Sequence, residues 1–198
     1  MTIHLRKGLP QSADVIFVLA GREYRKQYGL ELFKQGLAPM ILFSVSRFEI
    51  RRFSKMPLPI PLDLLKLASN VPPPMRHFFV LFEGPKVEVS YVRPRRFGTL
   101  TEIESLLRWL GHHQDVRSVV LISSQSHLRR VGMCCRSLLS EDLDLSLTSP
   151  PVQPPSVRYS HRLAAVFSEA FKTLAYWVVL ALRRDAPRTN SRILREQP

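Results

Sequence analysis

The sequence predicts an α/β protein with three layers and a mainly parallel sheet. Short apolar runs rich in Val, Ile and Phe alternate along the chain with segments whose apolar residues recur at helical spacing. Two of the runs, residues 14–20 and 39–45, are almost continuously apolar, as strands buried on both faces must be. Strands that alternate with helices in this way are typical of a parallel sheet covered by helices on both sides.

The first elements form a β-α-β unit. Residues 14–20 (DVIFVLA) predict a strand that ends at Gly21, where the chain must turn. Residues 22–35 have apolar side chains at helical spacing and stop before Gly36, a residue type common just after a helix. The next strand is predicted at residues 39–45. Such a unit within one sheet is almost always right-handed and parallel.

The middle of the chain is less regular. Residues 46–74 hold charges and the proline-punctuated stretch PLPIPLD, and we expect an excursion over the carboxyl end of the sheet with a short helix at 62–69. Residues 77–83 and 86–92 flank a Gly-Pro pair. Two alternatives stay open for them: a hairpin, or a helix followed by a strand.

The pattern becomes clear again after residue 98. Residues 99–110 predict an amphipathic helix, capped by Thr99 or Thr101. Residues 118–122 predict a strand, which leads through a polar turn into a second helix, and the alternation in 142–147 suits an edge strand. The buried face of the first helix is expected to carry Ile103, Leu106, Leu107 and Leu110.

The length of 198 residues, 45% of them hydrophobic, allows one substantial core. We expect a single domain over residues 14–184, preceded by a basic lead at 1–13. The domain includes a proline-rich connector at 148–156 and a C-terminal helix from about 161 to 184. Residues 185–198 are expected to be a disordered tail.

The formal net charge of +13 admits phosphorylated ligands, nucleic acid or anionic lipid as partners, although scattered charge is also typical of a solvated surface. The only cysteines are the neighbours Cys134 and Cys135, which fit no zinc spacing and indicate a reducing compartment. The apolar stretch 163–182 is interrupted by Glu169 and Lys172, and its uncharged run is too short to span a bilayer. We therefore expect a cytoplasmic protein, with peripheral membrane contact as the alternative, and no metal site.

A candidate site lies where the strand at 118–122 ends. The carboxyl ends of parallel strands line the usual ligand crevice, and His127 and Arg130 are three residues apart at the start of the following helix. His127 can act as a general acid or base or as a donor to a phosphate, or it can simply cap Ser124 or Ser126. Asp14, at the opposite end of its strand, is expected to be structural. No Walker loop, GxGxxG, HExxH or GxSxG element is present.

Blocks in this order resemble the YdcF-like family of bacterial proteins, which includes the SanA and ElyC envelope proteins. DVIFVLAGR resembles the opening strand of the family and keeps Gly21 from its glycine cluster, and the helix that follows begins with a site-facing arginine, here Arg25. FGTLTEIE resembles another helix start, in which Thr99 and Glu102 are kept. The most diagnostic block is LISSQSHLRRV, with Ser124, His127 and Arg130 in place.

The resemblance implies a Rossmann-like sandwich and a phosphorylated or nucleotide-type ligand. S-adenosylmethionine binding is associated with the YdcF branch, and envelope or lipid-carrier metabolism with the ElyC and SanA branch. His127 is then the candidate for catalysis, and the ligand contacts are expected from Gly21, Arg25, Thr99, Glu102, Ser124 and Arg130.

Two functions of different class follow from these observations. The first is a protein that binds a phosphorylated or nucleotide-type ligand at the carboxyl ends of the strands, with phosphate hydrolysis or group transfer left open. The alternative is a non-catalytic, envelope-associated module that uses its basic C-terminal helix. Nucleic-acid binding is the weakest candidate because the sequence shows no basic and aromatic platform.

Overall fold

The computed structural model describes residues 5–93, 98–139, 142–151 and 176. The expected C-terminal helix at 161–184 and the tail at 185–198 lie outside the described residues, apart from Tyr176.

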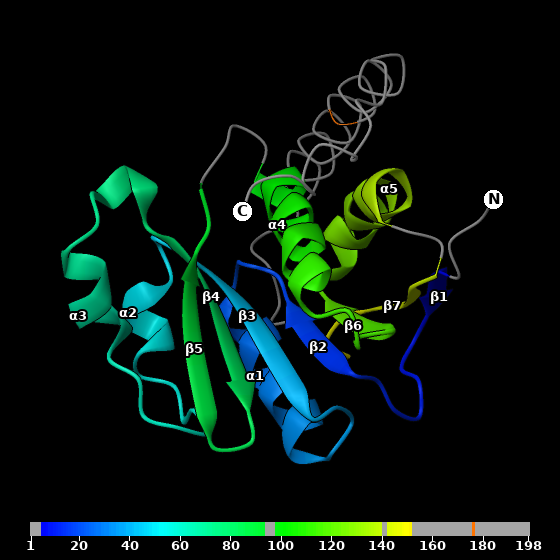
Figure 1. Cartoon of the computed structure of the whole chain (residues 1–198), viewed down its shortest axis with the longest axis horizontal. Coiled ribbons are helices and arrows are strands. Elements are labelled where there is room, and N and C mark those ends of the chain that lie inside the picture. Colours follow the sequence, from blue (N-terminus) through cyan, green and yellow to red (C-terminus); the bar gives the residue numbers. More distant parts are fainter. Residues whose placement is uncertain (1–4, 94–97, 140–141, 152–175, 177–198) are drawn as a thin grey trace, which may run out of the picture.

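The described residues form a seven-stranded sheet in the order β1-β7-β6-β2-β3-β4-β5 (Figure 1). The first five strands of this order are parallel to one another. At the other edge, β4 pairs with β3 in the antiparallel direction, and β5 pairs with β4 in the antiparallel direction. The sheet therefore confirms the predicted α/β class. The strands are β1 (Leu5–Lys7), β2 (Val15–Val18), β3 (Met40–Ser46), β4 (His77–Glu83), β5 (Lys86–Tyr91), β6 (Ser118–Ile122) and β7 (Asp144–Thr148).

Helices cover both faces of the sheet, which gives the three expected layers (Figure 1). Along β2, Val15 and Phe17 point into the core beneath α4 and α5, whereas Ile16 and Val18 point into the core beneath α1, α2 and α3. Cys134 and Cys135 pack in the first core. The helices are α1 (Glu23–Lys34), α2 (Ile50–Phe53), α3 (Leu64–Ser69), α4 (Gly98–His112) and α5 (Leu128–Leu138), with short 3-10 turns η1 (Pro73–Met75) and η2 (Gln125–His127).

The structure confirms the β-α-β opening, since β2 and β3 are parallel and α1 connects them. It also decides between the two alternatives for residues 77–92, which form an antiparallel hairpin. Gly84 makes the turn of this hairpin with φ of +51°, a conformation that favours glycine.

The expectation that residues 142–147 form an edge strand is wrong. β7 pairs with β6 on one side and with β1 on the other, so the edge is β1. β1 comes from the N-terminal lead and was not predicted, because three residues, two of them charged, are too short to show a strand period. The polar positions of β7 had suggested an exposed edge, yet Ser146 is buried.

Two further expectations need correction. α4 begins at Gly98, so Thr99 and Thr101 lie inside the helix and do not cap it, and Leu107 is 38% exposed while Trp109 is buried. The excursion after β3 lies at the carboxyl end of the sheet only in part, where Glu49 accepts a hydrogen bond from the backbone N–H of Gly21. From there, α2 and α3 pack against the sheet face that α1 also covers, because their apolar side chains need a core to bury them. Among the described residues, no helix combines the length and the apolar content needed to cross a bilayer.

Candidate functional site

β2 and β6 end side by side at the carboxyl edge of the sheet, and β3 continues beyond them to Ser46. In the register of the parallel strands, Val18 of β2 pairs with Phe43 of β3 and with Ile122 of β6. The turns that follow β2 and β6 therefore adjoin one another, and a hydrogen bond from the backbone N–H of Gly21 to Glu49 brings the segment after β3 to the first of them. This is the edge at which open α/β sheets bind their ligands.

Arg25 joins the two turns. It lies in the first turn of α1 and is only 3% exposed. Its Nη1 donates to the carbonyl oxygen of Ala20 at 2.7 Å, and its Nη2 donates to Ser124 Oγ at 2.7 Å and to His127 Nδ1 at 3.1 Å. Within the described residues no carboxylate lies within 4 Å of this guanidinium, and its Nε has no hydrogen-bond partner. Arg25 is therefore a buried cation held by neutral acceptors.

Gly21 makes room for this arginine. Its φ of +144° lies in the region that favours glycine, and a Cβ built there would come within 2.5 Å of Arg25 Nη1. Gly21, which was predicted to contact a ligand, is therefore required here by the structure itself. It lets the guanidinium lie directly against the β2–α1 turn.

The contact with Arg25 selects the tautomer of His127. A guanidinium has only donors, so the Nδ1 of His127 must accept, and the hydrogen of the neutral ring then sits on Nε2. His127 is half-buried at the junction of η2 and α5.

Glu102 reaches the β2–α1 turn from α4. Its Oε1 accepts a hydrogen bond from the backbone N–H of Ala20 at 2.7 Å, and Ser44 of β3 also hydrogen-bonds to the carboxyl group. The side chain is buried, and this burial raises the pKa of Glu102 to about 7. The carboxyl group can therefore gain or lose a proton near neutral pH.

Glu49 closes the same turn from the other side, and sequence reasoning missed it. Its Oε1 accepts from the backbone N–H of Gly21 at 2.8 Å and from Ser46 Oγ. Its Oε2 forms an ion pair with Lys26, which is almost completely buried, and burial lowers the pKa of Lys26. Both N–H groups of the turn, at Ala20 and Gly21, are thus occupied by the protein's own carboxylates.

A hydrogen bond extends this network to β4. His77 Nε2 lies 2.7 Å from Ser44 Oγ, and burial lowers the pKa of His77 to about 4. Neutral His77 with its hydrogen on Nε2 donates to Ser44, which in turn donates to the Glu102 carboxylate. The chain of bonds from His77 to Glu102 keeps the buried polar groups satisfied.

Arg130 and Thr99 form a second contact group between α5 and α4. Arg130 Nε donates to Thr99 Oγ1 at 3.4 Å, and its guanidinium carbon lies 5.4 Å from the centre of the Tyr176 ring. The backbone N–H of Thr99 donates to Tyr176 Oη at 3.1 Å. Arg130 is buried, whereas its neighbour Arg129 is exposed.

The seven predicted site residues therefore fall into two groups. The structure connects Gly21, Arg25, Glu102, Ser124 and His127 through Ala20 and Arg25, and it pairs Thr99 with Arg130.

The four residues that sequence reasoning missed are Lys26, Ser44, Glu49 and His77. Only Glu49 carried a signal, since it is the single acid among the basic residues 47–55.

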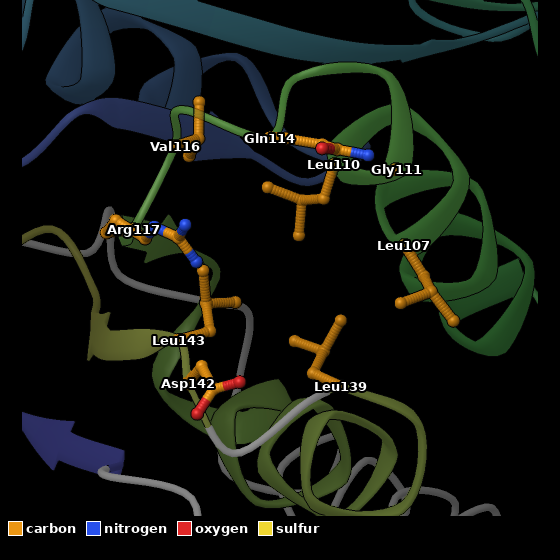
Figure 2. A pocket seen from close by; sticks show the side chains of 9 residues that line it. All are labelled: Leu107, Leu110, Gly111, Gln114, Val116, Arg117, Leu139, Asp142 and Leu143. Carbon is orange, nitrogen blue, oxygen red and sulfur yellow. The ribbon is translucent and has the colours of Figure 1, made fainter.

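The other end of the sheet holds structural features. Asp14 Oδ2 accepts from the backbone N–H groups of Arg117 and Ser118 at 2.8 and 2.7 Å, which agrees with the structural role expected for it. A cavity of about 290 Å³ lies near this end, between the last turns of α4 and α5 (Figure 2). Arg117 and Asp142 border it, and none of the predicted site residues does. Its apolar wall is made by Leu107, Leu110, Val116, Leu139 and Leu143.

Within the described ranges, no three side chains of His, Cys, Asp or Glu gather as a metal ion would require. Comparisons of the chain with protein-family models, with curated proteins and with solved structures found no match.

Proposed function

We propose that this chain is a YdcF-like protein that binds the anionic group of a phosphorylated or nucleotide-type small ligand at the turn between β6 and α5. The observation that carries the proposal is Arg25. A buried cation costs several kcal/mol unless an anion compensates it, and among the described residues no carboxylate lies within 4 Å of this one. An anion bound nearby would supply the missing charge.

The geometry favours the second turn over the first. At the β2–α1 turn, Glu102 and Glu49 already accept from the N–H groups of Ala20 and Gly21. A phosphate, or the carboxylate of S-adenosylmethionine, would meet two acceptors there instead of free donors. At the β6–α5 turn, Ser124 and His127 are neutral and are held by the positive guanidinium of Arg25.

His127 is the residue that we expect to contact the ligand. Its Nε2 carries the ring hydrogen and can donate to an anionic oxygen, while Arg25 behind the ring supplies positive charge. A hydrolytic or transfer reaction would also need a base. In this tautomer His127 offers a proton donor and no lone pair at Nε2, and Glu102 is the nearby group that titrates near neutral pH.

A thermal-shift and titration series tests the proposal. The ligands are inorganic phosphate, AMP, S-adenosylmethionine and a short-chain polyprenyl phosphate, and we expect at least one phosphorylated compound to stabilise the wild type. His127→Ala should weaken its binding about tenfold or more, the loss of one charge-assisted hydrogen bond. His127→Gln, which keeps a side-chain N–H, should recover part of the affinity.

The matched control is His112→Ala, because His112 is exposed in the last turn of α4. This variant should bind like the wild type. The proposal is wrong if none of the phosphorylated ligands stabilises the protein, or if His127→Ala and His112→Ala bind them equally well.

The envelope-associated alternative relied on the C-terminal helix, which lies outside the described residues. Among those residues, no observation favours that use of the helix.

A further inference from the structure

A basic and aromatic patch made by Arg47, Phe48, Arg51 and Arg52 lies just after β3 and takes no part in the network described above. Phe48 is 71% exposed, more than any other large hydrophobic residue described. The guanidinium carbon of Arg47 lies 4.4 Å from the centre of the Phe48 ring. The ring is therefore held at the surface beside a cation and is not buried in the core.

The short helix α2 directs the patch outward. Ile50 and Phe53 of this helix are buried in the core beneath α1, α2 and α3. The intervening residues Arg51 and Arg52 are exposed. Folding thus separates the two apolar residues of α2, which stabilise the fold, from Phe48, whose exposure contributes nothing to a core.

The charge of the patch has one sign. Residues 46–55 contain four basic residues, all of them exposed, and a single acid, Glu49. Glu49 is buried and paired with Lys26, so its charge is compensated inside the fold. The surface of this segment therefore presents cations around one exposed aromatic ring, and its natural complement is a surface that is both anionic and able to accept an apolar side chain.

The patch adjoins the candidate site. Arg52 borders a hollow of about 10 Å³ together with Gly21 and two acids, Glu23 and Glu49. The hollow itself has room for about one water molecule. Its walls show that the outward face of α2 lies next to the β2–α1 turn, at the carboxyl end of the sheet.

We propose that this patch docks the protein on the surface of an anionic lipid bilayer. Arg47, Arg51 and Arg52 contact the headgroups, and Phe48 inserts at the level of the acyl chain boundary. Peripheral binding of this kind needs two signals, because neither a few charges nor one apolar group holds a protein at a membrane alone. Docking does not depend on a ligand at the β6–α5 turn, but it would bring that turn close to the bilayer surface.

Vesicle sedimentation of the full chain tests the docking surface. The probes are phosphatidylcholine vesicles with and without phosphatidylglycerol, and we expect binding only to the anionic vesicles, weakening with added salt. Arg51→Gln/Arg52→Gln should lower the partition coefficient by about tenfold or more, from about 1 kcal/mol for each arginine. Phe48→Ser should have an effect of similar size.

Matched controls separate the patch from the overall charge. Arg117→Gln/Arg136→Gln removes two exposed arginines at the other end of the sheet, and Leu65→Ser removes an exposed apolar residue of α3. Both should bind vesicles like the wild type.

Docking through the patch is refuted if the wild type does not bind anionic vesicles. Equal loss in the two arginine pairs would also refute it, because binding would then follow net charge alone. Docking on a bilayer would also be refuted if the protein bound duplex DNA in a salt-sensitive way that requires Phe48 and did not bind vesicles.

Discussion

The β2–α1 turn and the β6–α5 turn occupy equivalent places at the ends of neighbouring parallel strands, yet their chemistry is opposite. Two buried carboxylates, Glu49 and Glu102, accept from the N–H groups of the first turn. The second turn holds the neutral groups of Ser124 and His127, and the cation Arg25 lies behind them. The N–H groups after β2 are therefore occupied by carboxylates of the protein itself, whereas the polar groups after β6 lie against a positive charge.

This difference shows that position alone does not make a ligand site. A glycine at the end of a first strand usually suggests close approach of a phosphate, but here Gly21 gives room to an arginine side chain. The network around the first turn is fully internal, and it fixes Arg25 so that the second turn can use its charge. We therefore expect substitutions at the first turn to change stability and those at the second to change binding.

The largest expected effect comes from breaking the ion pair behind the first turn. Glu49→Gln leaves Lys26 buried without its ion-pair partner and should lower the free energy of unfolding by about 3–5 kcal/mol. Urea denaturation measures the change. In the double variant Lys26→Met/Glu49→Gln the buried charge is gone and an acceptor for Gly21 is kept, so most of the loss should be recovered. A double variant no more stable than Glu49→Gln would contradict the role assigned to the pair.

The second effect concerns pH. Because the pKa of Glu102 rises from 4.5 in the unfolded chain to about 7 in the fold, its contribution to stability is complete below pH 4.5 and is lost as the pH rises through 7. From pH 4.5 to pH 8, the free energy of unfolding of Glu102→Gln should increase relative to that of the wild type by on the order of 3 kcal/mol. Urea denaturation of both proteins at the two pH values measures this gain.

The contribution of His77 to stability has the opposite pH dependence. Its pKa falls from 6.5 to about 4, so its contribution is present above pH 6.5 and is lost as the pH falls through 4. Comparing Glu102→Gln with the wild type at each pH removes this background. The exposed carboxylate of α1 in Glu31→Gln serves as control, and a constant difference between Glu102→Gln and the wild type would disprove the assignment.

The third prediction concerns the space beside Arg25. Gly21→Ala forces a side chain into a positive-φ conformation and against the guanidinium, and should destabilise the fold by about 1–3 kcal/mol. Thermal or urea unfolding can detect this loss. Gly111→Ala, where a Cβ meets nothing within 4 Å inside α4, should be neutral or slightly stabilising. If both variants had equal stability, the close fit of Gly21 on Arg25 would be excluded.

The smallest effect on stability is expected at the second turn. Ser124→Ala removes one hydrogen bond from Arg25 and should cost about 1 kcal/mol in urea denaturation. Ser126→Ala, two residues away and exposed, should stay within about 0.5 kcal/mol of the wild type. An unchanged stability of Ser124→Ala would show that Ser124 does not help to hold Arg25.

Much of the fold was predictable because its signals are local. The apolar runs that became β2, β3 and β6 are long enough to show burial on both faces, and α1 stops where Gly36 allows the chain to turn. β1 was missed because three residues carry no period, and β7 was mistaken for an edge because the partner that covers it comes from the far end of the chain.

The sequence by itself determined the parallel pairing of the opening unit, the helices α1, α3, α4 and α5, and the residue types at the carboxyl ends of the strands, since spacing and composition encode them directly. Only the tertiary structure decided what those residues do. Glu49 and Lys26 read as surface charges until folding buries them together, and Arg25 acquires its neutral partners from residues about 100 positions away. Burial and long-range pairing determine the charge around each turn, and neither can be predicted from local sequence patterns.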